Sequence, residues 1–347
     1  MARMRCAMLI GTLLVLCVTC PLSGQAPPED PWVVYDGFYG PGTGRHIVFV
    51  TGDEEYRSEE AMPQMAKILT KRHGFKCTVL FAINKETGEI HPDTTDNIPG
   101  LQALETADLM VIFTRSRNLP DEQMKYVVDY INSGKPIIGL RTATHAFRYP
   151  GDSTSPYKKY GRGTEGFEGG FGRQVIGEKW VDHWGDHGEE STRGVIADGM
   201  KDHPIVRGCE NIWGPTDVYE VSKLHGDSKP LVMGQVLNGM TPDSPPNEEK
   251  KMMPVAWTKS YTGDTSKTAR VFATTMGAAP DFESEDLRRL FVNACYWCLG
   301  MEDKIERRAN VNIVGEYKPT FFGFDKAKQG VKPSDHKLQA YGGLPMR

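Results

Sequence analysis

A polar stretch that could carry out chemistry directly follows an apolar run at residues 136–140. The stretch reads Arg141-Thr142-Ala143-Thr144-His145. An arginine can hold a carboxylate or a developing oxyanion, and a histidine can move a proton near neutral pH. We therefore predict that His145 transfers a proton and that Arg141 polarises an anion or a carbonyl group. Thr142 and Thr144 are predicted to bind the substrate.

A structural alternative explains the same residues. Arg141 would then pair with Asp53 or Glu54 across neighbouring strand ends, and His145 would cap a helix. The functional interpretation is favoured, because loops at strand ends are where α/β folds place their sites.

A second segment, residues 180–187, contains two histidines and two tryptophans, and the members of each pair are four positions apart. The four residues are Trp180, His183, Trp184 and His187. On a helix, both histidines would share one face and could ligate a divalent metal such as zinc, with His145 or Asp217 completing the set. Gly185 and Gly188 favour a loop instead.

The tryptophan rings of this segment also suit stacking on a sugar. We predict that Trp184 and Asp217 contact the substrate. The alternative is a packed aromatic loop whose histidines serve only the structure.

Acidic and aromatic residues follow the first apolar run of the chain. Glu55, Tyr56 and Arg57 are predicted to bind the substrate, although the same residues could form a solvated turn before a helix. Arg115 and Arg117 follow the third run, where they could face an anionic ligand or pair on the surface.

The elements that must position these residues form a repeating pattern of buried strands and helices. The apolar runs lie at residues 47–50, 77–81, 109–113 and 136–140, and amphipathic helices are expected at residues 58–69 and 120–131. This alternation predicts a parallel sheet, whose ligands bind at the carboxyl ends of the strands. Ser58 is expected to cap the first helix, and Ser284 is expected to cap a last helix that ends at Gly300.

The later apolar runs are shorter and more polar, which indicates a sheet edge or an antiparallel extension. They lie at residues 194–197, 218–221, 231–237, 254–258 and 270–274.

Residues 1–26 have the features of a secretory signal: a basic start with Arg3 and Arg5, a short apolar core and small residues before a cleavage point. We therefore expect export to the periplasm or the extracellular space, with no transmembrane anchor after cleavage. Loss of the two arginines makes the net charge of −4 more negative by two. An acidic chain offers no general attraction to nucleic acid.

Four cysteines lie beyond this segment: Cys77, Cys209, Cys295 and Cys298. Four are too few for a disulfide scaffold in a chain of this length, so we expect small buried hydrophobic residues. No nucleotide-binding glycine motif, phosphate loop or serine-hydrolase motif is present.

Motifs spread along the chain resemble those of the trehalose-utilisation (ThuA-like) family. They lie at residues 52–60, 136–145, 183–185, 203–205, 217–219, 254–257 and 270–272. The resemblance implies an α/β fold of the flavodoxin-like, class I glutamine amidotransferase-like type, with a doubly wound, mostly parallel sheet and helices on both faces. It also implies a link to the catabolism of sugars, in particular of keto-disaccharides.

The chain departs from the pattern of its relatives at three places. An amidotransferase carries its nucleophilic cysteine directly after the fourth strand, and no cysteine lies between Cys77 and Cys209. Arg141 stands where many relatives have histidine, and Gly277-Ala278 stands where many have Gly-His. Because the cysteine is missing, we expect no cysteine-dependent amidotransferase activity. The other two changes each remove a potential metal ligand or base.

The chain is accordingly divided into four parts. These are a signal peptide (1–26), an N-terminal arm (27–44), a ThuA-like domain (45–302) and a C-terminal tail (303–347) expected to pack on the domain through its phenylalanines. The expected function is hydrolysis or isomerisation of a small-molecule carbohydrate. The alternative is a non-catalytic carbohydrate-binding or scaffold module, and a homo-oligomer is left open in both cases.

Overall fold

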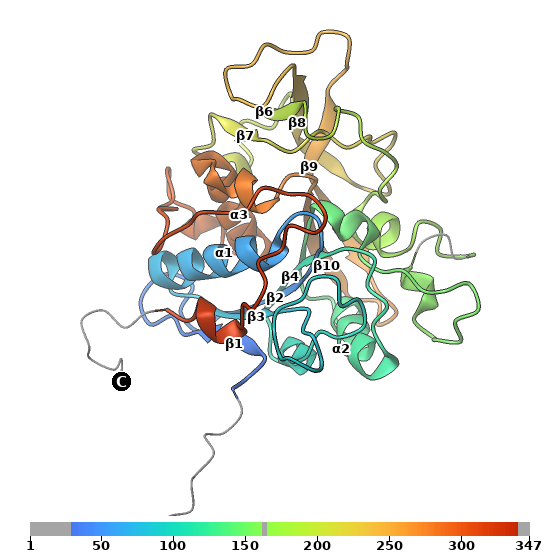
Figure 1. Cartoon of the computed structure of the whole chain (residues 1–347). Coiled ribbons are helices and arrows are strands. Elements are labelled where there is room, and N and C mark those ends of the chain that lie inside the picture. Colours follow the sequence, from blue (N-terminus) through green and yellow to red (C-terminus); the bar gives the residue numbers. More distant parts are fainter. Residues whose placement is uncertain (1–28, 162–164, 339–347) are drawn as a thin grey trace, which may run out of the picture.

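The computed structural model describes residues 29–161 and 165–338, which contain one ten-stranded sheet (Figure 1). Its strands are β1 (Trp32–Tyr35), β2 (His46–Gly52), β3 (Lys76–Leu80), β4 (Leu109–Thr114), β5 (Ile137–Leu140), β6 (Ser191–Ile196), β7 (Ile212–Gly214), β8 (Lys229–Leu237), β9 (Met253–Thr262) and β10 (Thr268–Thr274). The order across the sheet is β1-β3-β2-β4-β5-β10-β9-β8-β6-β7. The predicted signal peptide lies outside the described residues.

The middle of the sheet is parallel and its two ends are antiparallel. Strands β3, β2, β4, β5 and β10 pair in parallel. Strand β1 pairs antiparallel with β3, and β9, β8, β6 and β7 continue antiparallel from β10. The predicted α/β fold with parallel core strands is confirmed, and the sheet as a whole is mixed. In Figure 1 the antiparallel extension with β6, β7 and β8 lies at the top.

Three α-helices accompany the sheet in the described residues: α1 (Ser58–His73), α2 (Asp121–Asn132) and α3 (Glu285–Cys298). The Ser284 hydroxyl accepts a hydrogen bond from the Leu287 amide and caps α3 as predicted. The prediction that Ser58 caps α1 is wrong, because its hydroxyl accepts the Gly52 amide at the end of β2 instead. Ser58 thereby ties the start of α1 to the end of the strand before it.

Alternate residues of the central strands contribute to two buried clusters. Ile47 and Phe49 belong to one cluster, together with residues of α1 and α3, whereas Val48 and Val50 belong to the other, together with residues of α2. This explains why the strands are continuous apolar runs, since both of their faces are covered. The four cysteines Cys77, Cys209, Cys295 and Cys298 are buried and free, as predicted.

The structure differs from the expected strands at two places. The arm before residue 45 contains strand β1, whose Val33 and Tyr35 are buried while Val34 is exposed. Conversely, residues 218–221 form no strand, and only Tyr219 makes an isolated bridge, to His183. That bridge anchors the loop of residues 180–187 beside Asp217.

The chain after α3 packs back onto the fold through its described residues, up to 338. Phe322 is only 2% exposed, and the ring of His336 stacks on Phe81 with 5.4 Å between centroids. Phe321 and Phe324 are about half exposed. Within residues 29–161 and 165–338, no helix is both long and apolar enough to span a bilayer.

Candidate functional site

Loops from the carboxyl ends of several parallel strands meet at one edge of the sheet, and Asp53 ties two of them together. Following β2, its Oδ1 atom accepts the amides of Glu55 and Tyr56, both at 2.7 Å. Its other oxygen accepts the hydroxyl of Thr142, which follows β5 in the short 3₁₀ helix Arg141–His145. The buried carboxylate of Asp53 therefore fixes the two turns relative to each other.

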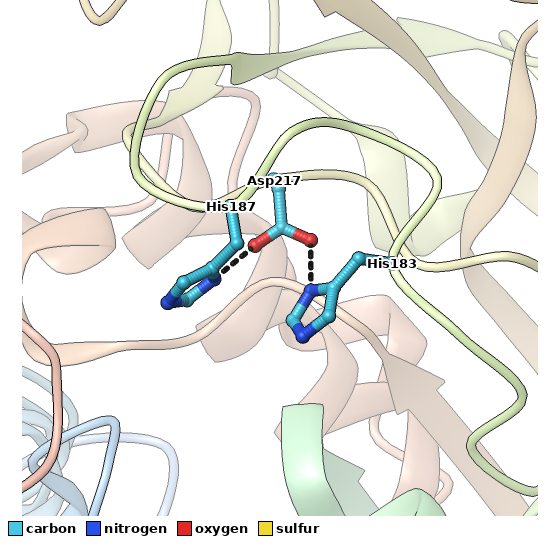
Figure 2. Close-up of side chains that lie close together, drawn as sticks. All are labelled: His183, His187 and Asp217. Carbon is cyan, nitrogen blue, oxygen red and sulfur yellow. Dashed lines mark hydrogen bonds and ion pairs between the residues drawn. The ribbon is translucent and has the colours of Figure 1, made fainter.

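Asp217 is the centre of the polar cluster at this edge (Figure 2). Its Oδ2 accepts Nδ1 of His183 at 2.7 Å, and its Oδ1 accepts Nδ1 of His187 at 2.9 Å and Nη2 of Arg141 at 2.9 Å. Burial alone would raise the pKa of Asp217, but the charge of Arg141 and the hydrogen bonds from both histidines lower the pKa overall. A carboxylate only accepts, so each imidazole carries a proton on Nδ1, and the lone pair of the neutral ring lies on Nε2.

Arg141 stands behind Asp217 and is itself completely buried. Its guanidinium lies between the rings of Tyr56 and Tyr219, 4.1 and 4.2 Å from their centroids, and donates to the carbonyl of Thr275 at 2.7 Å. Its φ of 39° is unusual for a side chain with a Cβ, as often seen at functional sites. The predicted contact between Arg141 and substrate does not fit this placement. Arg141 instead forms a buried ion pair with Asp217. The alternative prediction, that Arg141 pairs with Asp53 or Glu54, is therefore wrong.

A polar cavity of about 540 Å³ opens in front of this cluster. It is lined by residues from the segments that follow β2, β3, β4, β5 and β7, the 180–187 loop included: Glu54, Glu55, Thr95, Arg115, Ser116, Asn118, His145, Arg148, Pro150, Trp180, His183 and Tyr219. Sites for small ligands have cavities of this size, roughly 300–1,000 Å³. The structure therefore brings Glu55, His145 and His183 to the lining of one cavity, with Asp217 bonded to His183 from outside the lining.

The other predicted site residues lie behind the wall or away from it. Tyr56 supports Arg141, and Thr142 is bonded to Asp53. Thr144 lies 3.1 Å from Nδ1 of His145 and orients that ring. Arg57 is fully buried and donates to the carbonyl of Gly323. Trp184 points elsewhere, since its Nε1 donates to the Lys251 carbonyl.

Some residues of the cavity lining, such as Thr95 and Arg148, were not identified from the sequence, whereas Trp180 was named as a possible stacking ring and Glu54 as a possible partner of Arg141. The ring of Trp180 lies 5.6 Å from His145 and 5.9 Å from His183, between centroids. Glu54 pairs with Arg115 and Arg117, both at 2.5 Å; Arg115 also lines the cavity, whereas Arg117 is fully buried and makes its pair inside the fold. The position of Glu54 at a strand end was the signal that could have identified it.

Glu55 joins the histidine pair from the opposite loop. Its Oε1 lies 3.6 Å from Nε2 of His187, and its Oε2 lies 3.3 Å from Nε of Arg115. Burial and the neighbouring charge of Asp53 raise the pKa of Glu55. Glu55 therefore combines access to the cavity with an increased ability to carry a proton.

The same cluster has the chemistry of a metal-binding site. Among the described residues, ligand atoms of His183, His187 and Asp217 lie within 4.8 Å of one another. Asp217 already accepts Arg141 and both Nδ1 atoms, and a carboxylate in that role orients imidazoles whose Nε2 atoms bind the ion. The three side chains therefore offer nitrogen and oxygen donors of the kind that a divalent ion binds.

A family model for trehalose utilisation (ThuA) matches residues 45–298, a span that includes the loops of the cavity and the Asp217 cluster. The chain belongs to the ThuA family. No curated protein matches it. The site described above thus lies within the part of this ThuA-family chain that carries the family's pattern, whereas residues 299–338 lie outside that part.

Solved structures similar to the chain include a ThuA-like protein from Parabacteroides merdae, with 17% identity, a TM-score of 0.43 and coverage of 85% of this chain and 99% of that one. Another is the glutaminase domain of Trypanosoma brucei CTPS, with 11% identity, a TM-score of 0.34 and coverage of 78% and 98%.

Proposed function

We propose that this ThuA-family chain is an exported enzyme of carbohydrate catabolism, acting in the periplasm or outside the cell on a keto-sugar derivative. The observation that carries the proposal is the His183–Asp217 pair at the wall of a polar cavity large enough for a disaccharide. A buried carboxylate that orients a histidine facing a cavity is an arrangement suited to general acid–base chemistry.

The proposed reaction begins with removal of a proton from the carbon next to the keto group. Two reactions share this step: isomerisation of the keto-sugar, and hydrolysis by elimination of the glycosidic oxygen followed by addition of water to the resulting double bond. His183 takes the proton on Nε2, while Asp217 accepts from Nδ1 and stabilises the imidazolium that forms. Glu55 also lines the cavity. In this proposal it returns a proton to the leaving oxygen or to the neighbouring carbon.

This proposal moves the proton-transfer role from His145 to His183. His145 lines the cavity but is only 7% exposed, whereas His183 is more accessible and is oriented by the carboxylate of Asp217. The four described cysteines are buried and none lines the cavity, so the proposed chemistry uses no cysteine.

Sugar binding is expected to depend on Trp180 and not on Trp184. Trp180→Ala should weaken binding of a 3-keto-glucoside about tenfold in calorimetry, since roughly 1.4 kcal/mol of ring contact corresponds to that factor. Trp184→Ala is the matched control, because this ring lies outside the cavity wall and should change the affinity less than about twofold. Equal effects of the two substitutions would contradict the assignment of the cavity. Binding without turnover in the wild type would favour the non-catalytic module.

A metal site is the second candidate, favoured by the proximity of His183, His187 and Asp217. The Nε2 atoms of the two histidines would hold a divalent ion such as zinc, and the ion would polarise a carbonyl oxygen of the substrate. This candidate predicts on the order of one zinc per chain in protein purified without chelator, and its loss from His187→Ala. If elemental analysis finds zinc near zero in the wild type, the metal-site candidate is excluded. The result also decides the role of His183, because an ion on Nε2 would occupy the lone pair that proton transfer needs.

A further inference from the structure

The chain after α3 returns to the edge of the sheet that carries the cavity. Its residues 320–324, here called the strap, lie outside the part matched by the family model. The amide of Gly323 donates to the carbonyl of Glu55 at 2.7 Å, and its carbonyl accepts Nη2 of Arg57 at 3.1 Å. The amide of Thr320 donates to Glu60 at 2.8 Å. The strap is therefore bonded to the turn after β2 and to the first turn of α1.

Side chains of the strap contact the functional residues themselves. The Phe322 ring lies 5.3 Å from the ring of His187 and 5.6 Å from that of Tyr56, between centroids. The Arg115 guanidinium, which lines the cavity, lies 4.9 Å from the centroid of Phe324. Three members of the site, Glu55, His187 and Arg115, thus each have a partner in the strap.

Phe322 is only 2% exposed, whereas His187, on which it packs, is exposed to solvent. An exposed ring has few neighbours to hold it, so the contact with Phe322 matters for its orientation. The His187 ring is held by Asp217 at Nδ1, lies 3.6 Å from Glu55 at Nε2, and is flanked by Tyr56 and Phe322. The rings of Tyr56, Phe322 and His183 pack around this imidazole and restrict its rotation. Removal of Phe322 would open the space into which the ring can turn.

We propose that Phe322 is a positioning residue and that the strap completes the site: it fixes the ring of His187 and the backbone of Glu55 at the cavity. The consequence for catalysis rests on the function proposed above, whereas the consequence for His187 does not. A chain with an altered strap would keep the fold and the His183–Asp217 pair but lose the defined orientation of His187.

The test compares Phe322→Ala with Val311→Ala in the full chain. Val311 is a matched control, because it is 1% exposed and lies in the same C-terminal region but is not part of the cavity lining. Proteins labelled with ¹⁵N-histidine are compared by NMR at one pH. We expect the His187 ring signals to shift or broaden in Phe322→Ala and to remain in place in Val311→Ala, with the His183 signals retained in both.

A conservative variant guards against a general loss of folding. Phe322→Leu keeps an apolar contact and should restore the His187 signals in part. If Phe322→Ala is folded and its His187 signals match those of the wild type, the proposal is overturned. If Phe322→Ala does not fold, Phe322→Leu and the bulkier Phe322→Trp are compared with the wild type instead. His187 signals that are unchanged in both variants overturn the proposal.

The activity readout is separate. On a 3-keto-glucoside that the wild type turns over, Phe322→Ala should lower kcat at least fivefold, and Val311→Ala should not. If the wild type turns over no keto-sugar, the proposed function fails while the NMR comparison still decides the role of Phe322.

Discussion

Replacing Asp217 with asparagine is expected to reduce turnover about 10²–10⁴-fold and to destabilise the fold at the same time. The asparagine amide can donate to an imidazole nitrogen, so the proton of His183 would move from Nδ1 to Nε2 and the base would be lost. The buried guanidinium of Arg141 would also lose its counter-charge. Breaking a buried ion pair in this way costs about 3–5 kcal/mol of unfolding free energy, with the low end expected because asparagine still offers a carbonyl oxygen.

Chemical denaturation of Asp217→Asn and the wild type measures the stability effect. Asp129→Asn is the control, since it removes an ion pair to Lys125 that is more than half exposed and should cost less than about 0.5 kcal/mol. A midpoint for Asp217→Asn equal to that of Asp129→Asn would show that Arg141 does not depend on Asp217.

Replacing His183 with glutamine is expected to reduce turnover about 10²–10⁴-fold, the contribution of a positioned general base. Glutamine can still donate to Asp217 but cannot accept a proton, and the stability should change little because the histidine is only partly buried. The measurement is kcat on a 3-keto-glycoside, with sugar affinity determined in parallel to show that the cavity is intact.

Two further histidines make this result specific. His203→Gln alters a histidine outside the cavity and should leave kcat within about twofold. His145→Gln alters a residue of the wall and should have a smaller effect than His183→Gln. A larger effect of His145→Gln would return the proton-transfer role to His145.

The location of the site could be predicted from the sequence because the central strands are buried on both faces. Ile47, Val111 and Ile138 lie in apolar runs whose ends are unambiguous, and the polar residues that follow must lie at the same edge of a parallel sheet. The positions of β2, β4 and β5 and the place of Arg141–His145 follow from that rule.

The roles within the site could not be predicted in the same way, since they depend on partners far apart in the chain. Arg141 and Asp217 are separated by 76 positions, and nothing in the local pattern shows that the arginine lies under Tyr56 and Tyr219. The contact of Phe322 with His187 spans an even longer separation. Ser58 illustrates the same limit on a smaller scale, because the Gly52 amide competes for the hydroxyl that a capping rule assigns to α1.

In the proposed reaction, His183 is oriented by Asp217 and removes a proton next to the carbonyl group of a keto-sugar bound in the cavity. ¹H NMR in deuterated water measures this step directly, without assuming which product forms. The wild type should replace the protons beside the keto group of a 3-keto-glycoside by deuterium faster than buffer alone, and His183→Gln should not. Exchange at the same rate in wild type, His183→Gln and buffer would contradict the claim.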